Sequence, residues 1–210
     1  MNKINNKRFI SFEGIDYSGK TTQINLLKTY LETRNEKVFI LREPGGTVIS
    51  EQIRMILLDT EHDAMDDYTE ILLYSAARSQ LVQEKIIPLL QQDYFVIADR
   101  YVDSTTAYQG FGRGIDAEIV QQINQVATRG VLPRFTFYME LSPQKAQERR
   151  KQAVLAIDRL ESAGIEFYER VFNGYRTIAQ SSGDRFHILD AEKNIEQIHR
   201  KIIQIINQQI

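Results

Sequence analysis

The sequence predicts an α/β protein of three layers, in which a five-stranded parallel sheet is flanked by helices. Three observations lead to this prediction: short apolar runs rich in β-branched and aromatic residues, amphipathic segments between them, and a glycine-rich turn after the first run. Strands that alternate with helices are typical of right-handed βαβ units, whose sheets are covered on both faces. No repeat or proline-rich linker divides the 210 residues, so residues 1–210 are predicted to form a single domain.

The predicted strands are almost continuously apolar, as expected for strands buried on both faces of a parallel sheet. They span residues 8–12 (RFISF), 38–41 (VFIL), 94–98 (YFVIA) and 135–141 (FTFYMEL), with a weaker fifth strand at 185–189 (RFHIL).

Helices are predicted where apolar residues recur every three or four positions. These segments are 20–34, 70–91 and 195–206. Because ligands of such sheets bind at the carboxyl ends of the strands, functional residues are expected in 13–22, 42–47 and 99–100.

The composition excludes several classes of protein. A formal net charge of −2 gives no reason to expect a nucleic-acid polymer or an anionic membrane as a partner. The absence of cysteine excludes disulfide scaffolds, cysteine nucleophiles and cysteine-ligated zinc. No signal peptide is recognisable, and no apolar stretch approaches the roughly 18 residues that a membrane span needs. A cytoplasmic protein is therefore expected.

Residues 14–21 (GIDYSGKT) match the pattern of a phosphate-binding loop, here called the phosphate cradle. Its glycines let backbone N–H groups approach phosphates, Lys20 reaches the β- and γ-phosphates, and Thr21 offers a hydroxyl to Mg²⁺. The helix that begins near Lys20 adds the positive end of its dipole. The alternative, a glycine-rich turn with a solvated lysine, does not explain why the complete motif stands between an apolar strand and an amphipathic helix. The residues expected at the triphosphate are Gly14, Ile15, Asp16, Tyr17, Ser18, Gly19, Lys20, Thr21 and Thr22.

Other parts of the sequence indicate which class of nucleotide-binding protein uses this triphosphate site. Neither Asn-Lys pair continues into the base-reading motif of a guanine-nucleotide switch. The third predicted strand ends in Asp99-Arg100, one acid beside one base, whereas a motor ATPase would usually end it in adjacent acids. This pattern suits a small phosphotransferase whose second ligand carries a phosphate.

Four arginines lie in or just after the segments that should surround the cleft: Arg42, Arg54, Arg78 and Arg100. Transfer between two nucleotides needs two anionic sites that face each other, and the planar guanidinium suits phosphate oxygens. Any one of these arginines could be an ordinary surface residue. Several at one end of the sheet favour a second anionic ligand.

Four motifs occur in order along the chain: FEGIDYSGKTTQ at 12–23, REPGGT at 42–47, DRYVDSTTAYQG at 99–110 and DRLE at 158–161. With them, the chain resembles the thymidylate kinase family from residue 8 to about residue 175. The second and third motifs are far more specific than the cradle alone. The resemblance implies a P-loop kinase fold with a helical lid at about 144–162. It also implies a homodimer and the phosphorylation of dTMP to dTDP by ATP and Mg²⁺ in dTTP biosynthesis.

The resemblance assigns roles at the reacting phosphates. Lys20, Asp16 and Arg100 are implied to be catalytic. Asp16 would contact the deoxyribose 3′-hydroxyl or a water linked to Mg²⁺, and Asp99 would steer Mg²⁺ together with Thr21.

The resemblance also implies the residues that bind dTMP. Tyr74 would stack on thymine, and Arg78, its neighbour one helical turn on, would hydrogen-bond a thymine carbonyl. Without the resemblance, a core aromatic and a solvated arginine would be the simpler interpretation of this pair. Tyr108 would crowd the 2′ position of the sugar and favour deoxyribose. The complete set is Asp16, Arg42, Arg54, Tyr74, Arg78, Arg100, Thr105, Tyr108 and Gln109. The stretch 110–114 (GFGRG) after it is expected to be a loop.

Residues 144–151 (QKAQERRK) are rich in cations and are either a solvated helix face or the start of the lid. Family members supply a transition-state arginine from the cradle, where this chain has Tyr17, or from inside the lid, where 153–157 are apolar (AVLAI). The remaining candidates are Arg149, Arg150, Lys151 and Arg159. Arg149 is expected near adenine, and Arg150 or Arg159 at the transferring phosphoryl group.

Two rival functions stay open from the sequence. A deoxynucleoside kinase would need a carboxylate base for its uncharged acceptor, and Glu13, Asp16 or Glu43 could fill that role. A nucleotide-sensing module without turnover is conceivable because the cradle arginine is absent.

Overall fold

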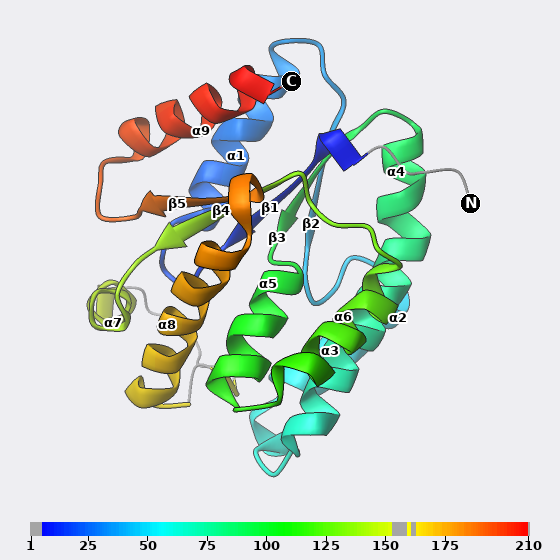
Figure 1. Cartoon of the computed structure of the whole chain (residues 1–210), viewed down its shortest axis with the longest axis vertical. Helices are drawn as coiled ribbons and strands as arrows, with labels where there is room; N and C mark the ends of the chain where they lie inside the picture. The colour runs from blue at the N-terminus through cyan, green and yellow to red at the C-terminus, as the bar shows by residue number, and fades with distance from the viewer. Residues whose placement is uncertain (1–5, 153–158, 161–162, 210) are drawn as a thin grey trace.

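The sheet is the centre of the molecule. The computed structural model (Figure 1) describes residues 6–152, 159–160 and 163–209. Its five strands are all parallel and lie in the order β2-β3-β1-β4-β5. They are β1 (Phe9–Glu13), β2 (Val38–Arg42), β3 (Phe95–Asp99), β4 (Phe135–Glu140) and β5 (Phe186–Asp190). The predicted five-stranded parallel sheet is confirmed, with boundaries within one residue of those expected.

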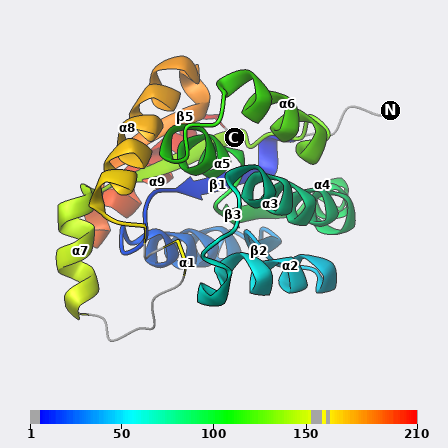
Figure 2. The same ribbon diagram turned by 90° about the horizontal axis from the view of Figure 1, so that it is seen from below.

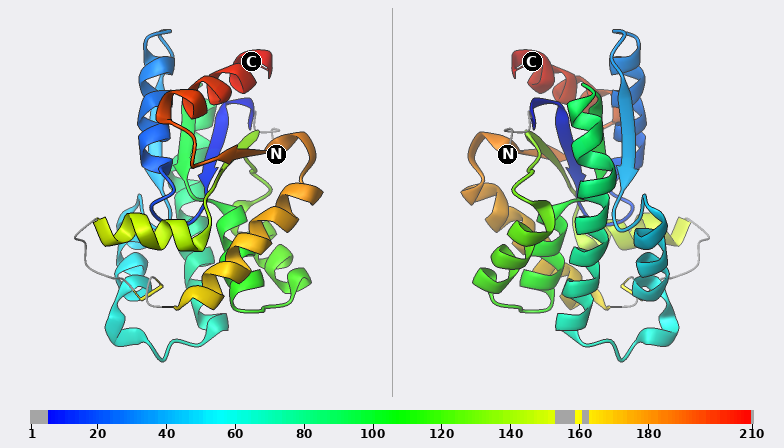
Figure 3. Two further views of the ribbon diagram at one scale, coloured as in Figure 1. Left: turned by 90° about the vertical axis from the view of Figure 1, so that its left-hand side faces the viewer. Right: turned by 90° about the vertical axis from the view of Figure 1, so that its right-hand side faces the viewer.

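Helices cover both faces of this sheet and complete three layers, as Figures 2 and 3 show. The α1 and α9 helices lie on one face, and α3, α4, α5 and α8 lie on the other. The helices are α1 (Lys20–Glu32), α2 (Val48–Leu58), α3 (Asp67–Leu81), α4 (Ile87–Gln91), α5 (Val102–Thr105), α6 (Ala117–Thr128), α7 (Pro143–Gln152), α8 (Ile165–Ser181) and α9 (Ile195–Gln209). Two π-helical segments, η3 (Val82–Ile86) and η4 (Thr106–Gly112), join α3 to α4 and extend α5. Short 3₁₀ turns occur at η1 (Asn6–Arg8), η2 (Thr60–His62) and η5 (Gly183–Arg185).

Local chemistry sets where these helices begin. The Asp66 carboxylate accepts hydrogen bonds from the backbone N–H groups of Tyr68 and Thr69, which starts α3 three residues before the predicted position. Thr47, the last residue of the REPGGT motif, caps α2 in the same way through the N–H of Ser50. The REPGGT motif thus also sets the start of a helix.

Successive residues of β1 belong to different sides of the core, as the alternation of a strand requires. Ile10 and Phe12 belong to the cluster that includes Leu27 of α1 and Ile202 of α9. Phe9 packs in the cluster formed with α3 and α4, which includes Leu81. The first strand is therefore buried on both faces and holds the cradle that follows it.

Two expectations about local structure are wrong. The edge strands are not buried on both faces, since Phe39 of β2 is 38% exposed and Ile188 of β5 is 48% exposed. Each edge strand has only one neighbour in the sheet and is covered less completely by helices. The stretch 110–114 is not simply a loop, because 110–112 complete η4. A Cβ on Gly112 would lie 2.6 Å from the Phe167 ring of α8, so this glycine permits close packing.

Candidate active site

The phosphate cradle connects β1 to α1 with two glycines in the left-handed region of backbone space. Gly14 has φ 134°, and a Cβ there would lie 2.7 Å from the backbone oxygen of Met139. Gly19, at φ 90°, precedes the first residue of α1. Side chains are strained at such φ values, so the glycines let the loop turn its backbone toward a ligand.

The Lys20 side chain folds back onto this loop and contacts its backbone. Its Nζ donates to the backbone oxygens of Gly14 at 2.9 Å and Ile15 at 3.0 Å, and the residue is only 6% exposed. Burial, followed by the neighbouring Arg100 guanidinium, lowers the pKa of Lys20 to about 8, although nearby carboxylates favour the cation. Lys20 is thus a buried cation at neutral pH, with a pKa below that of an exposed lysine.

Arg100 and Asp16 form the wall beside the cradle. Arg100 Nη2 donates to Asp16 Oδ1 at 2.6 Å, and Nη1 donates to the backbone oxygen of Gly14 at 2.7 Å. Burial favours the neutral form of Asp16, but Arg100 and Lys20 outweigh it and keep the pKa of this carboxyl below its usual value. Asp16 is therefore a carboxylate, and its side chain is 44% exposed.

Two cavities meet at this wall. The cradle cavity is lined by Tyr17, Gly19, Lys20, Thr21, Thr22, Arg42, Asp99 and Arg149, and the second cavity by Pro44, Leu58, Tyr74, Arg78, Ser104, Thr105, Tyr108, Gln109 and Leu160. Both are also lined by Asp16, Glu43, Arg54 and Arg100. Ligands in the two cavities can therefore approach each other, with Arg54 and Arg100 between them.

All of the predicted dTMP-binding residues line the second cavity except Arg42. Arg42 lies on the cradle side, half exposed, with its Nη2 3.5 Å from Glu51 Oε2. The predicted metal residues, Thr21 and Asp99, line the cradle cavity. Among the residues that the structure describes, no cluster of three Asp, Glu, His or Cys side chains could hold a metal by itself.

Arg78 has a different set of partners from the predicted one. It donates to Glu43 Oε2 through Nε at 2.7 Å, and its Nη2 lies 2.6 Å from the same oxygen. The other acceptors are Thr105 Oγ1 at 2.8 Å, Asn124 Oδ1 at 3.2 Å and the backbone oxygen of Tyr101 at 3.1 Å. Four of these contacts are hydrogen bonds, and a guanidinium has five N–H groups. The protein therefore engages most of the Arg78 donors, and the hydrogen bond to a thymine carbonyl stays a prediction.

Glu43 lines both cavities but is not among the binding residues that the sequence predicted. It is 4% exposed, its Oε2 is bound by Arg78, and no described residue donates to its Oε1. Burial raises its pKa, and the Arg78 pairing opposes this shift. Its place in the REPGGT motif was the available signal, whereas nothing in the sequence pointed to Asn124.

Glu13 lies behind the cavities rather than in them. It accepts hydrogen bonds from the Tyr101 backbone N–H at 2.7 Å, the Tyr175 hydroxyl at 3.0 Å and the Ser104 hydroxyl. Burial, then the charge of Asp103, raises its pKa to about 7. It accepts three hydrogen bonds from the protein and lines none of the cavities, which argues against a role as the base of a nucleoside kinase.

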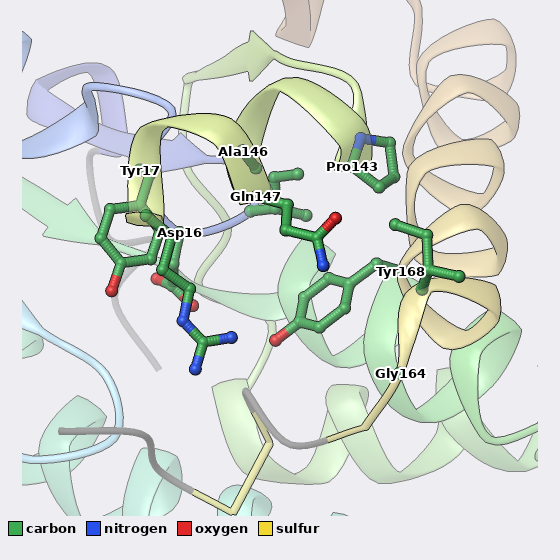
Figure 4. Close-up of a pocket in the computed structure, with 10 residues that line it drawn as sticks. Asp16, Tyr17, Pro143, Ala146, Gln147, Gly164 and Tyr168 are labelled. Atoms are coloured by element: carbon green, nitrogen blue, oxygen red, sulfur yellow. The ribbon is translucent and has the colours of Figure 1, made fainter. Parts of the chain in front are cut away.

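The predicted lid cations lie in three different places. Arg149 of α7 donates to the backbone oxygens of Tyr17 at 3.1 Å and Ala191 at 2.7 Å. Arg150 lines a third cavity, which is also lined by Asp16 and Tyr17. Figure 4 shows Asp16 and Tyr17 on one side of it, with Gln147 of α7 and Tyr168 of α8 across from them.

Arg159 lies outside these cavities. Its Nε donates to the backbone oxygen of Leu57 at 2.9 Å and its Nη2 to Glu70 Oε2 at 2.6 Å, and it lines none of these cavities. Because Arg159 lines none of these cavities, this arrangement gives no support to the catalytic role expected for it. The apolar run 153–157, and with it Asp158 and Glu161, lies outside the described residues.

Comparison with known proteins decides what kind of site this is. The family model for thymidylate kinase matches residues 12–202. The chain belongs to the thymidylate kinase family. It is thus a member of a family of nucleoside monophosphate kinases, and neither rival function receives support.

Similar thymidylate kinases extend over almost the whole chain. That of Chlorobaculum tepidum is 46% identical over 94% of this chain and 96% of its own length, and that of Prosthecochloris aestuarii is 47% identical over 94% and 92%. The crystal structure of the thymidylate kinase from Ehrlichia chaffeensis superimposes with a TM-score of 0.79, at 34% identity, over 97% of this chain and all of that one. The P-loop kinase fold that the sequence predicted is therefore confirmed.

Proposed function

We propose that this chain transfers the γ-phosphoryl group of ATP to dTMP, which yields dTDP for dTTP synthesis in the cytoplasm. One observation carries the proposal: the phosphate cradle and the second cavity share Asp16, Arg54 and Arg100. A triphosphate in the first and a monophosphate in the second would meet end to end, which is the alignment that phosphoryl transfer needs.

On the donor side, the cradle N–H groups and Lys20 would bind the β- and γ-phosphates. The hard oxygen donors Thr21 and Asp99 both line this cavity and suit Mg²⁺, which would neutralise phosphate charge when it is bound. On the acceptor side, Arg54 and Arg100 would face the dTMP phosphate. That phosphate already carries an ionised oxygen, so no strong general base is required.

The activity is tested by measuring ADP release with dTMP, dUMP, CMP, AMP and thymidine as acceptors. We expect dTMP to be the best substrate. A higher kcat/KM for another monophosphate would overturn the specificity, and a higher value for thymidine would favour a deoxynucleoside kinase. Tight ATP binding without turnover of any acceptor would favour a sensing module.

Arg150 is the cation that we assign to the transferring phosphoryl group. It lines a cavity together with Asp16 and with Tyr17, which occupies the position of the missing cradle arginine. Arg150→Gln should lower kcat by about 10³-fold, the scale of a transition-state arginine. Lys151→Gln, the next cation on α7, is the control and should lower kcat by less than a tenth of that factor.

A homodimer is also part of the proposal. Large apolar side chains remain exposed on α2 and α3, which pack side by side (Figure 1): Val48 is 77%, Met55 66% and Leu72 56% exposed. A second copy of the chain would cover this face. Sedimentation should give a dimer that Met55→Glu converts to a monomer. A wild-type monomer at micromolar concentration would refute the dimer without affecting the proposed reaction.

A further inference from the structure

Glu70, near the start of α3, is the centre of a buried cluster that touches the second cavity without lining it. Its side chain is fully buried. Gln109 Nε2 donates to its Oε1 at 2.9 Å, while Arg113 Nη2 and Arg159 Nη2 donate to its Oε2 at 2.9 and 2.6 Å. Of these three partners, Gln109 lines the second cavity.

The charge of this cluster fixes the state of Glu70. Burial favours the neutral acid, but the hydrogen bonds from Arg113, Gln109 and Arg159 and the charge of Arg113 outweigh burial and lower the pKa of Glu70. Glu70 is therefore a carboxylate at neutral pH. A carboxylate accepts hydrogen bonds and cannot donate them.

This restriction determines which way the Gln109 amide points. Only its NH₂ group can face Glu70, because a carbonyl facing a carboxylate would leave two acceptors in contact. The Gln109 carbonyl oxygen is the opposite end of the same planar group and is left as the hydrogen-bonding end for the cavity. The base of a nucleotide that lies beside Tyr74 therefore meets an acceptor at Gln109.

We propose that Glu70 is a positioning residue that selects the base of the acceptor by orienting Gln109. Thymine and uracil carry an N3–H donor that fits the Gln109 carbonyl, whereas cytosine has an acceptor at N3. The site thus takes pyrimidines that are protonated at N3 and rejects cytosine through a residue that never touches the base. This inference rests on the proposed function, in which the second cavity binds a pyrimidine monophosphate.

The test is Glu70→Gln, assayed with dTMP, dUMP and dCMP. An amide at position 70 can present either end to Gln109, so Gln109 can turn its NH₂ group toward the cavity and donate to cytosine. The ratio of kcat/KM for dTMP over dCMP should fall about tenfold, the scale of one hydrogen bond. The ratio for dTMP over dUMP should stay within about twofold, because both bases carry N3–H and the methyl contact is untouched.

Arg113→Lys is the matched control. Arg113 binds the same carboxylate and also pairs with Asp67 at 3.3 Å, but it does not line the cavity. The substitution removes the guanidinium but keeps a positive charge beside Glu70, so it should lower stability and leave both ratios unchanged. If Glu70→Gln lowers kcat/KM for all three substrates equally, Glu70 is merely structural and the inference is overturned.

Circular dichroism decides whether Glu70→Gln folds. If it does not, Gln109→Met keeps the carboxylate with its two arginines and must show the same selective loss. An unchanged dTMP to dCMP ratio in that variant overturns the inference. Absence of dTMP turnover in the wild type would instead refute the proposed function.

Discussion

The cradle cavity and the second cavity adjoin each other but are built in opposite ways. The cradle is one continuous segment, in which two glycines with positive φ and a lysine bound to backbone carbonyls form the surface. The second cavity is assembled from side chains of α2, α3, α5, η4 and the turns after β2 and β3. The phosphate-binding loop of the donor site therefore depends on local backbone conformation, and the acceptor site depends on contacts between distant elements.

Lys20 of the cradle and Arg78 of the second cavity differ in the same way. Lys20 donates to two backbone oxygens of its own loop, with Asp16 Oδ1 3.9 Å away, and can transfer its N–H groups to phosphate. Arg78 already satisfies a buried carboxylate, two side-chain oxygens and a carbonyl. Changes in the cradle should therefore reduce catalysis more than stability, and changes at Arg78 should first reduce stability.

The largest expected effect is on stability. Arg78→Met leaves the Glu43 carboxylate buried without its partner and should lower the free energy of unfolding by about 3–5 kcal/mol, measured by urea denaturation. The control is Arg176→Met, since Arg176 is 58% exposed and pairs with Glu140 at 3.0 Å. Its loss should cost less than about 1 kcal/mol. Equal costs for the two variants would show that the second cavity does not depend on its buried pair.

The next effect is on catalysis. Lys20→Met should lower kcat/KM by about 10²–10³-fold, because a charge that stabilises the phosphates is lost. The free energy of unfolding should not fall, since burial of the cation opposes folding. Lys28→Met, at an exposed lysine of the same helix, should retain wild-type rates. A Lys20→Met variant that unfolds easily but retains its kcat would reverse the distinction between the two cavities.

The pH dependence of ATP binding follows from the same lysine. The folded pKa of about 8 is below the ordinary value of 10.5, so free Lys20 is charged below pH 8 and neutral above it. Because bound phosphates require the cation, the Kd for ATP should be constant below pH 8 and rise about tenfold per pH unit above it. Calorimetric titrations from pH 7 to 9.5 measure this slope. The slope should vanish in Lys20→Met, and a slope that persists there must come from another group.

The smallest effect concerns Arg42, which the resemblance assigned to the dTMP phosphate and the structure places on the cradle side. Arg42→Gln should raise the KM for ATP by about fivefold or less, as expected for an exposed charge, and leave the KM for dTMP unchanged. Initial rates with each substrate varied in turn separate the two constants. A rise confined to dTMP would return Arg42 to the acceptor site.

Local patterns predicted most of the fold. The five strands agree within one residue, and the predicted helix at 70–91 is present as the continuous series α3, η3 and α4. The predictions that were wrong concern residues whose environment depends on neighbours distant in the sequence. Exposure of Phe39 depends on which strand lies at the edge, and the helical geometry at Gly112 depends on packing against Phe167. Neither neighbour is visible in the local sequence.

The site, like the fold, has one part that local sequence predicts and another that depends on tertiary contacts. The sequence by itself determined the phosphate cradle, because the loop geometry is written in consecutive residues with two glycines, a lysine and a threonine at fixed spacing. Only the tertiary structure decided that Arg78 pairs with Glu43, that Arg159 pairs with Glu70 and that Gln109 donates a hydrogen bond to Glu70. The physical reason is that these residues are 35, 89 and 39 positions apart, and a side chain's free donors depend on which partners folding brings beside it.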